Sequence, residues 1–185
     1  LKAEGQNTPA DMLLTVDAGN LWQAAEQGLL QPVSSTVLEA NVPAKYRDPK
    51  GQWTGLSLRA RTIFYDPNKV TANSYYYGRL LDEKPNFPVK IFWANQDTTG
   101  THVNISGAGV VAGSDNPDGT LKLIEWLSSD EAQGLYASSD KEFPVKVGID
   151  ESDMLRSWGE FKKDDINVQK FGELQTQAIQ MMDKA

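Results

Sequence analysis

The segment Met12-Leu13-Leu14-Thr15-Val16-Asp17-Ala18-Gly19-Asn20-Leu21-Trp22 decides the fold class. Its first five residues form a short, mostly apolar run, which is typical of a buried β-strand. After the Asp-Ala-Gly turn, apolar residues recur near one helical face, and this predicts a helix over residues 20–27 that ends at Gly28. A strand that turns directly into a helix is the building unit of an α/β fold.

The rest of the chain continues with strands first and helices later. Apolar runs and turn residues predict a tight turn at residues 48–51 within a loop-rich stretch, then strands at residues 60–65, 87–93 and 105–111. Helices are predicted at residues 117–127, from a capping box of Ser128 and Glu131 to Tyr136, and over residues 168–182. No linker or repeat divides the chain, so we expect a single α/β domain over residues 1–185.

Composition excludes several classes of function. The 185 residues carry a net charge of −7, so no basic surface is available to bind nucleic acid. No apolar run approaches the roughly 18 residues of a membrane-spanning helix, so we expect no direct insertion into a membrane. The chain has one histidine, no cysteine and no nucleophile motif. We therefore expect a binding protein and not an enzyme.

Three consecutive tyrosines are the most unusual chemical feature, in the run Asn73-Ser74-Tyr75-Tyr76-Tyr77-Gly78-Arg79. A phenol ionises at about pH 10, but ferric iron is charged strongly enough to bind it as phenolate. If Asn73 or Ser74 caps a helix, the tyrosines fall in its first turn, where free amides and the helix dipole favour an anion. Aromatic packing is the alternative interpretation, and the residues alone leave it open.

Charged residues near the predicted strands are further candidates for a site. Asp17 follows the first strand, where open α/β sheets place ligands, although capping the next helix is the role we favour. Arg59 and Arg61 can hold an anion or balance phenolate charge, or can alternate along a strand as one solvated face. His102 is the single histidine, and we interpret it as structural.

Four motifs along the chain resemble one known family. In order they are Thr15-Val16-Asp17-Ala18-Gly19-Asn20-Leu21-Trp22, Gly55-Leu56-Ser57-Leu58-Arg59-Ala60-Arg61, the tyrosine run, and Gly100-Thr101-His102-Val103-Asn104-Ile105-Ser106-Gly107-Ala108-Gly109-Val110. Together they resemble the periplasmic ferric-iron-binding proteins, the substrate-binding components of iron(III) ABC transporters. The resemblance implies a periplasmic-binding-protein-like (type II) lobe, built as a three-layer αβα sandwich with a mixed sheet. It also implies a periplasmic protein that delivers Fe3+ to an inner-membrane permease, although no signal peptide is evident at the start of the chain.

The resemblance also implies roles for individual residues. Tyr75 and Tyr76 match the adjacent tyrosines that coordinate Fe3+ as phenolates in the family, whereas Tyr77 matches a non-ligating aromatic position. Asn73 matches a position that contacts an accompanying synergistic anion, such as carbonate, phosphate or citrate. Because both phenols must lose a proton to bind iron, we expect binding to release protons and to weaken at low pH.

The sequence departs from this family in two places. It begins after the position of the family's first strand, which carries an early His or Tyr ligand, and residues 66–78 form a shortened crossover in place of most of the second lobe. We therefore expect about one lobe, with a vacancy in its sheet that rearrangement or a partner chain must close. The alternative function is a single-lobe or truncated scaffold with weak or no iron binding, which forms a homo-oligomer if the strand is supplied in trans.

Overall fold

The computed structural model describes residues 1–65, 90–140 and 142–184. The four strands of its main sheet are β1 (Met12–Thr15), β2 (Thr54–Ala60), β5 (Val103–Val110) and β6 (Phe143–Pro144). They follow the order β1-β5-β2-β6, and each neighbouring pair is antiparallel. We predicted a mixed sheet, but the described ladders are antiparallel because β1 and β2 run in the same direction on either side of the reversed β5.

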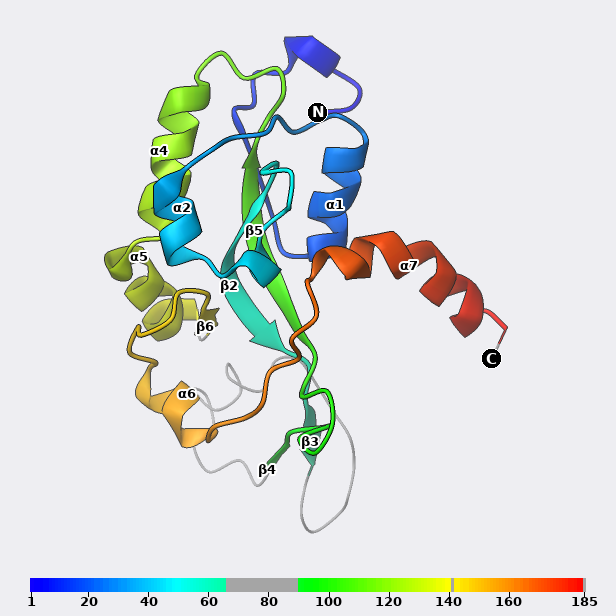
Figure 1. The fold of residues 1–185 in the computed structure, drawn as a ribbon, viewed down its shortest axis with the longest axis vertical. Coiled ribbons are helices and arrows are strands. Elements are labelled where there is room, and N and C mark those ends of the chain that lie inside the picture. Colours follow the sequence, from blue (N-terminus) through cyan, green and yellow to red (C-terminus); the bar gives the residue numbers. More distant parts are fainter. Residues whose placement is uncertain (66–89, 141, 185) are drawn as a thin grey trace.

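Helices cover both faces of the sheet (Figure 1). On one face lie α1 (Ala18–Glu26) and, packed against it, α7 (Gln169–Met182), while α4 (Pro117–Leu127) lies on the other. Neighbouring residues of β5 contact opposite layers. A Cβ added to Gly107 would lie 2.8 Å from Leu21 of α1, whereas Ala108 packs in one cluster with Ile124 of α4. The predicted three-layer αβα arrangement is confirmed.

Shorter elements complete the described fold. They are the helices α2 (Thr36–Asn41), α5 (Asp130–Leu135) and α6 (Asp153–Ser157), the hairpin of β3 (Ile63–Tyr65) with β4 (Lys90–Phe92), the 3-10 turns Gly5–Asn7 and Ala44–Tyr46, and the π-helical turn Tyr136–Asp140. The four strands of the main sheet pair consecutively, so no vacancy interrupts it among the described residues. Among the described strands, β1 lies at one edge of the main sheet.

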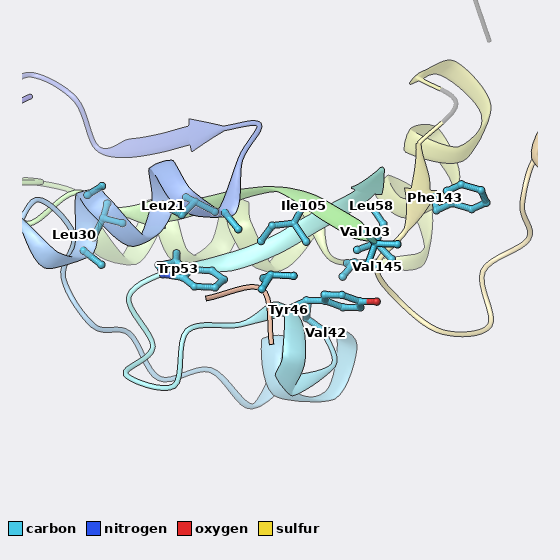
Figure 2. Packing of buried hydrophobic residues seen from close by; sticks show 14 of the residues in the cluster. Leu21, Leu30, Val42, Tyr46, Trp53, Leu58, Val103, Ile105, Phe143 and Val145 are labelled. Atoms are coloured by element: carbon cyan, nitrogen blue, oxygen red, sulfur yellow. The ribbon is translucent and has the colours of Figure 1, made fainter. Parts of the chain in front are cut away.

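The larger hydrophobic core lies on the α1 face of the sheet (Figure 2). Side chains from α1, β2, β5 and the loops between them meet there, among them Leu21, Tyr46, Trp53, Leu58 and Ile105, each at most 3% exposed. Burying a large apolar side chain contributes roughly 1.5–3 kcal/mol, so this cluster supplies much of the stability of the fold.

A β-bulge lets β2 contribute to both cores. Its register with β5 shifts between Gly55 and Ser57, which makes Leu56 an extra residue. Leu56 packs in the α4-side cluster and Leu58 in the α1-side cluster, although regular alternation would place both on one face. The side chain of the fully buried Gln133 of α5 stabilises this bulge through hydrogen bonds. Its Nε2 donates to the Leu56 carbonyl at 2.7 Å, and its Oε1 accepts from the Val145 amide at 2.8 Å.

Predicted elements recur in the structure with shifted boundaries. The helices predicted at residues 117–127 and 168–182 match α4 and α7, and the first helix starts at Ala18. The strand predicted at residues 60–65 is wrong in extent, because β2 begins at Thr54 and the chain breaks between β2 and β3. The capping box is wrong by one residue. Ser129 accepts from the Ala132 amide as the N-cap of α5, while Ser128 ends α4.

Candidate functional site

The candidate ligands Tyr75 and Tyr76, and Asn73 beside them, lie outside the described residues. The described flanks of their segment are Tyr65 of β3 and Lys90 of β4, which pair with each other. This hairpin extends from the end of the main sheet at which β2 ends (Figure 1). Arg59 and Arg61 lie at this end of β2. Asp17 follows β1, which ends earlier, opposite Gly107, and its carboxylate contacts Asn104, the β5 residue that pairs with Arg59.

Aromatic packing anchors the β3-β4 pair to the rest of the described fold. Trp93, directly after β4, stacks on Phe161 with ring centroids 3.9 Å apart and planes 9° from parallel. Its indole Nε1 donates to the Trp158 carbonyl at 3.1 Å. Before β3, the Thr62 hydroxyl donates to the Phe92 carbonyl at 2.7 Å. The strands on both sides of the tyrosine segment are thus tied to the described fold.

Asp17 caps α1, which is the role favoured above. Its Oδ1 accepts from the Gly19 amide at 2.7 Å, and its Oδ2 accepts from the side-chain amide of Asn104 at 2.9 Å. Asn104 is buried, and its Oδ1 accepts from the Ala18 amide at 3.1 Å and from the Ile105 amide at 2.8 Å. β1 ends at Thr15, opposite Gly107, so β5 extends beyond β1 at Asn104. There the side-chain oxygen of Asn104 accepts hydrogen bonds from these two main-chain amides.

The Arg59 side chain is bound by partners within the described fold. Its Nη2 donates to the Ile105 carbonyl at 3.2 Å, and its Nε lies 3.9 Å from a carboxylate oxygen of Glu142. The other Glu142 oxygen accepts from the hydroxyls of Ser57 and Ser106. Both members of the ion pair are about one-fifth exposed, so the interpretation of Arg59 as part of a solvated face is wrong.

Arg61 lies just beyond β2 and is exposed. Its amide donates to the His102 carbonyl at 2.8 Å, which keeps the two chains together after the ladder ends. Burial lowers the pKa of His102, and the positive charge of Arg61 lowers it further. The His102 ring also packs on Phe171 of α7, with centroids 4.5 Å apart. These contacts agree with a structural role for His102 as a neutral imidazole.

Sequence reasoning missed two residues of this cluster. Asn104 stands inside an otherwise mostly apolar strand, and such a polar residue in a buried strand is a usable signal of a local hydrogen-bond network. Glu142 gave no comparable signal, because its partners Arg59 and Ser57 are distant in sequence. Within residues 1–65, 90–140 and 142–184, no group of three or more His, Cys, Asp or Glu side chains could hold a metal ion. None of the helices in these ranges has the length and apolar character needed to cross a membrane.

Charge at this end of the sheet is largely compensated. Arg59 faces the Glu142 carboxylate, and the Asp17 carboxylate accepts hydrogen bonds at both oxygens. A ligand would have to break these contacts to use either residue. Arg61 is exposed, so it can meet an anion without disturbing a described hydrogen bond of its side chain.

Comparisons with known proteins agree with this arrangement. No protein-family model matches the chain. Iron uptake protein A1 of Synechocystis is 31% identical over 271 aligned positions, which cover the whole of this chain and 75% of that protein. The structure of IdiA (FutA) of Trichodesmium in complex with iron and citrate superposes with a TM-score of 0.92 at 33% identity, over 99% of this chain and 85% of that one. The ferric binding protein of Campylobacter jejuni gives a TM-score of 0.90 at 27% identity, over 98% of this chain and 85% of that one.

These relatives share both sequence and architecture with the chain along its length. The similarity to iron uptake protein A1 extends over three quarters of that relative, and the two solved structures superpose on nearly all of this chain. Their fold is that of the type II periplasmic binding proteins, in agreement with the αβα layers described above. The chain therefore belongs to the periplasmic ferric-iron-binding protein family.

Proposed function

We propose that this chain is the substrate-binding component of an iron(III) ABC transport system. In this proposal it works in the periplasm, binds Fe3+ through the phenolates of Tyr75 and Tyr76, and delivers the ion to an inner-membrane permease. The observation that carries it is an adjacent tyrosine pair within a chain whose whole length matches an iron uptake protein. No enzymatic step is required of it.

The chemistry of ferric iron supports tyrosine ligands. Fe3+ is a hard cation that favours anionic oxygen donors, and phenolates supply them without any carboxylate cluster. Ferric iron takes about six donors, so two tyrosines leave most of the shell to other groups. In the Trichodesmium relative, citrate accompanies the iron. Carbonate, phosphate or citrate, beside Asn73, can complete the shell here.

The described arginines have different roles in this proposal. Arg61 is exposed and follows β2 at the sheet end from which β3 and β4 extend, and these strands flank the tyrosine segment in the sequence. It is therefore the described cation that we assign to balance an anionic complex. Arg59 is held by Glu142, and Asp17 by α1 and Asn104. We propose that these two residues keep the rim of the site in shape and do not bind the anion.

The domain organisation is also part of the proposal. We propose that residues 1–185 form one lobe of a binding protein that has two lobes in its relatives, with residues 66–78 as a shortened crossover. The alignment to iron uptake protein A1 runs over 271 positions although this chain has 185 residues, so that relative carries stretches without a counterpart here. This difference in length supports a reduced second lobe.

A second candidate function is a single-lobe scaffold that binds iron weakly or not at all and associates with a second copy. The outer side of β1 favours it. β1 pairs with β5 on one side, and the apolar side chains of Leu14 and Val16 are 56% and 60% exposed. Exposed apolar residues on an edge strand promote pairing with another chain. Analytical ultracentrifugation separates the two candidates, because a strict monomer at all concentrations contradicts self-association.

Iron stoichiometry tests the first candidate. The purified chain is dialysed against ferric citrate and then against iron-free buffer, and bound iron is measured by mass spectrometry of the metal. We expect one Fe3+ per chain at neutral pH, with proton release on binding and loss of iron as the pH falls, because both phenols must be ionised. Iron that is absent at neutral pH contradicts the proposal and favours the scaffold.

A further inference from the structure

A cavity lies on the α4 side of the sheet. Its volume is about 210 Å3, and it lies between α2, the turn at residues 48–51, β2 and α4. None of its lining residues is Asp17, Arg59 or Arg61. Drug-sized ligands occupy cavities of roughly 300–1,000 Å3, so this one suits a smaller molecule.

A buried hydroxyl without a described partner belongs to a residue in the wall of the cavity, Thr54. Thr54 is 4% exposed, and its Oγ1 has no hydrogen-bond partner within the described ranges of the chain. Thr54 pairs with Ala108 across the ladder, and cross-strand partners direct their side chains to the same face. Ala108 belongs to the α4-side cluster, so the Thr54 side chain lies on the same side of the sheet as the cavity. A buried polar group that stays unbonded is costly, which points to a bound polar partner.

Arg47 adds a cation to the wall of the same cavity. It pairs with Thr54 in an isolated antiparallel bridge, so both side chains lie on one face, and both line the cavity. The guanidinium Nε donates to the Val42 carbonyl at 2.9 Å. Its two Nη atoms donate to no described residue, and a guanidinium fork with free Nη donors matches the geometry of a carboxylate.

The other lining residues indicate which chemical group the ligand carries besides its carboxylate. Leu38, Ala108 and Ile124 line the cavity and are buried and apolar. Two acidic residues, Glu39 and the buried Asp48, also line the cavity. Asp48 accepts the Gln52 amide at 2.9 Å within its own turn, and Glu39 is exposed on α2. We propose that this cavity binds a short monocarboxylic acid, with its carboxylate on Arg47 and Thr54 and its apolar body against the three buried side chains.

The test uses the iron-free chain and three probes of the same shape. These are 3-methylbutanoate, 3-methylbutan-1-ol and 3-methylbutan-1-amine, each titrated while amide chemical shifts are followed by NMR. We expect the acid to bind at least about tenfold more tightly than the alcohol, because a charge-assisted hydrogen bond is worth roughly that factor. Its largest shifts are expected at Thr54, Leu38 and Gly51. Equal affinity for the alcohol, tighter binding of the amine, or shifts centred on Asp17 and Asn104 overturns the proposal.

A pair of variants isolates the hydroxyl. Thr54→Val keeps the shape and the β-branched side chain but removes Oγ1, and we expect it to bind 3-methylbutanoate about tenfold more weakly. Thr176→Val on the exposed part of α7 is the matched control and leaves the affinity unchanged. If Thr54→Val binds the acid as tightly as the native chain, the hydroxyl is only an unsatisfied core group and the proposal is wrong. Arg47→Gln gives the same comparison for the cation, and Thr54→Val remains decisive if that variant does not fold.

Discussion

Replacing Asn104 by leucine removes the side chain that organises the junction of β1, α1 and β5. The buried Asn104 Oδ1 accepts two main-chain amides, those of Ala18 and Ile105, at 3.1 and 2.8 Å. Its Nδ2 donates to Asp17 at 2.9 Å. Leucine has nearly the same shape but offers neither acceptor nor donor, so both amides lose this partner in a place that water cannot easily reach.

The magnitude follows from those two amides. A buried donor left without a partner costs roughly 1–3 kcal/mol, so two of them cost about 2–6 kcal/mol. Burial of the added apolar surface of leucine offsets part of this loss of stability. We expect Asn104→Leu to reduce the free energy of unfolding by about 3 kcal/mol, measured by urea denaturation monitored through tryptophan fluorescence. A loss below about 0.5 kcal/mol, the level of a neutral surface substitution, refutes this reasoning.

Asn104→Asp separates the acceptor from the donor. The new carboxylate can still accept the two amides, but it lies against the Asp17 carboxylate in place of a donor. Two adjacent carboxylates raise the pKa of one of them, so the folded state takes up a proton more readily than the unfolded state. We expect the variant to be less stable than the native chain at pH 7 and to regain stability as the pH falls through the raised pKa. A constant difference across pH contradicts the predicted contact with Asp17.

Four further substitutions test the packing and the electrostatics. Gly107→Ala should cost about 2–4 kcal/mol, because its Cβ would lie 2.4 Å from the Thr54 carbonyl oxygen, whereas Gly134→Ala, with open space around it, should stabilise α5 by roughly 0.5–1 kcal/mol. Equal effects in thermal denaturation would contradict the close approach. Gln133→Met should lose about 2–4 kcal/mol in urea, since two buried hydrogen bonds disappear, and a neutral result would show that the bulge does not need it. Burial lowers the pKa of His102, so the unfolded chain takes up a proton before the folded chain as the pH falls below about 6.5, and the stability decreases. His102→Gln should make this decrease of stability with pH shallower. An unchanged slope would argue against a lowered pKa of His102.

The sequence was sufficient for elements whose pattern is local. The apolar run before Asp17 predicted β1, and Pro117 with the helical period predicted α4. It failed for β2, which was placed at residues 60–65 although Leu56, Leu58 and Ala60 alternate with Ser57 and Arg59. The bulge that turns Leu56 and Leu58 to opposite faces is recognised only when the partner strand β5 and the hydrogen bonds from Gln133 are known. Sheet direction was missed for the same reason, since pairing is set by contacts between distant segments.

The candidate site shows the same contrast between residues with local signals and residues whose partners are distant in sequence. The capping role of Asp17 could be predicted, because an Asp before a helix is a local signal. The engagement of Arg59 could not, because Glu142 lies 83 positions further along the chain and only folding brings the two side chains within 3.9 Å. The network of Asn104 likewise depends on where β1 ends relative to β5. Sequence patterns therefore identified the candidates, and the fold decided which of them are already occupied by protein partners.

The visible spectrum of the chain with ferric citrate tests the proposed iron ligands most directly. Phenolate bound to Fe3+ gives a charge-transfer band, and we predict an orange to red protein whose band is lost in the variant Tyr75→Phe/Tyr76→Phe. Tyr77→Phe is the matched control from the same run of tyrosines, and it should keep the band. A colourless native protein, or a band that survives the loss of both Tyr75 and Tyr76, contradicts the account.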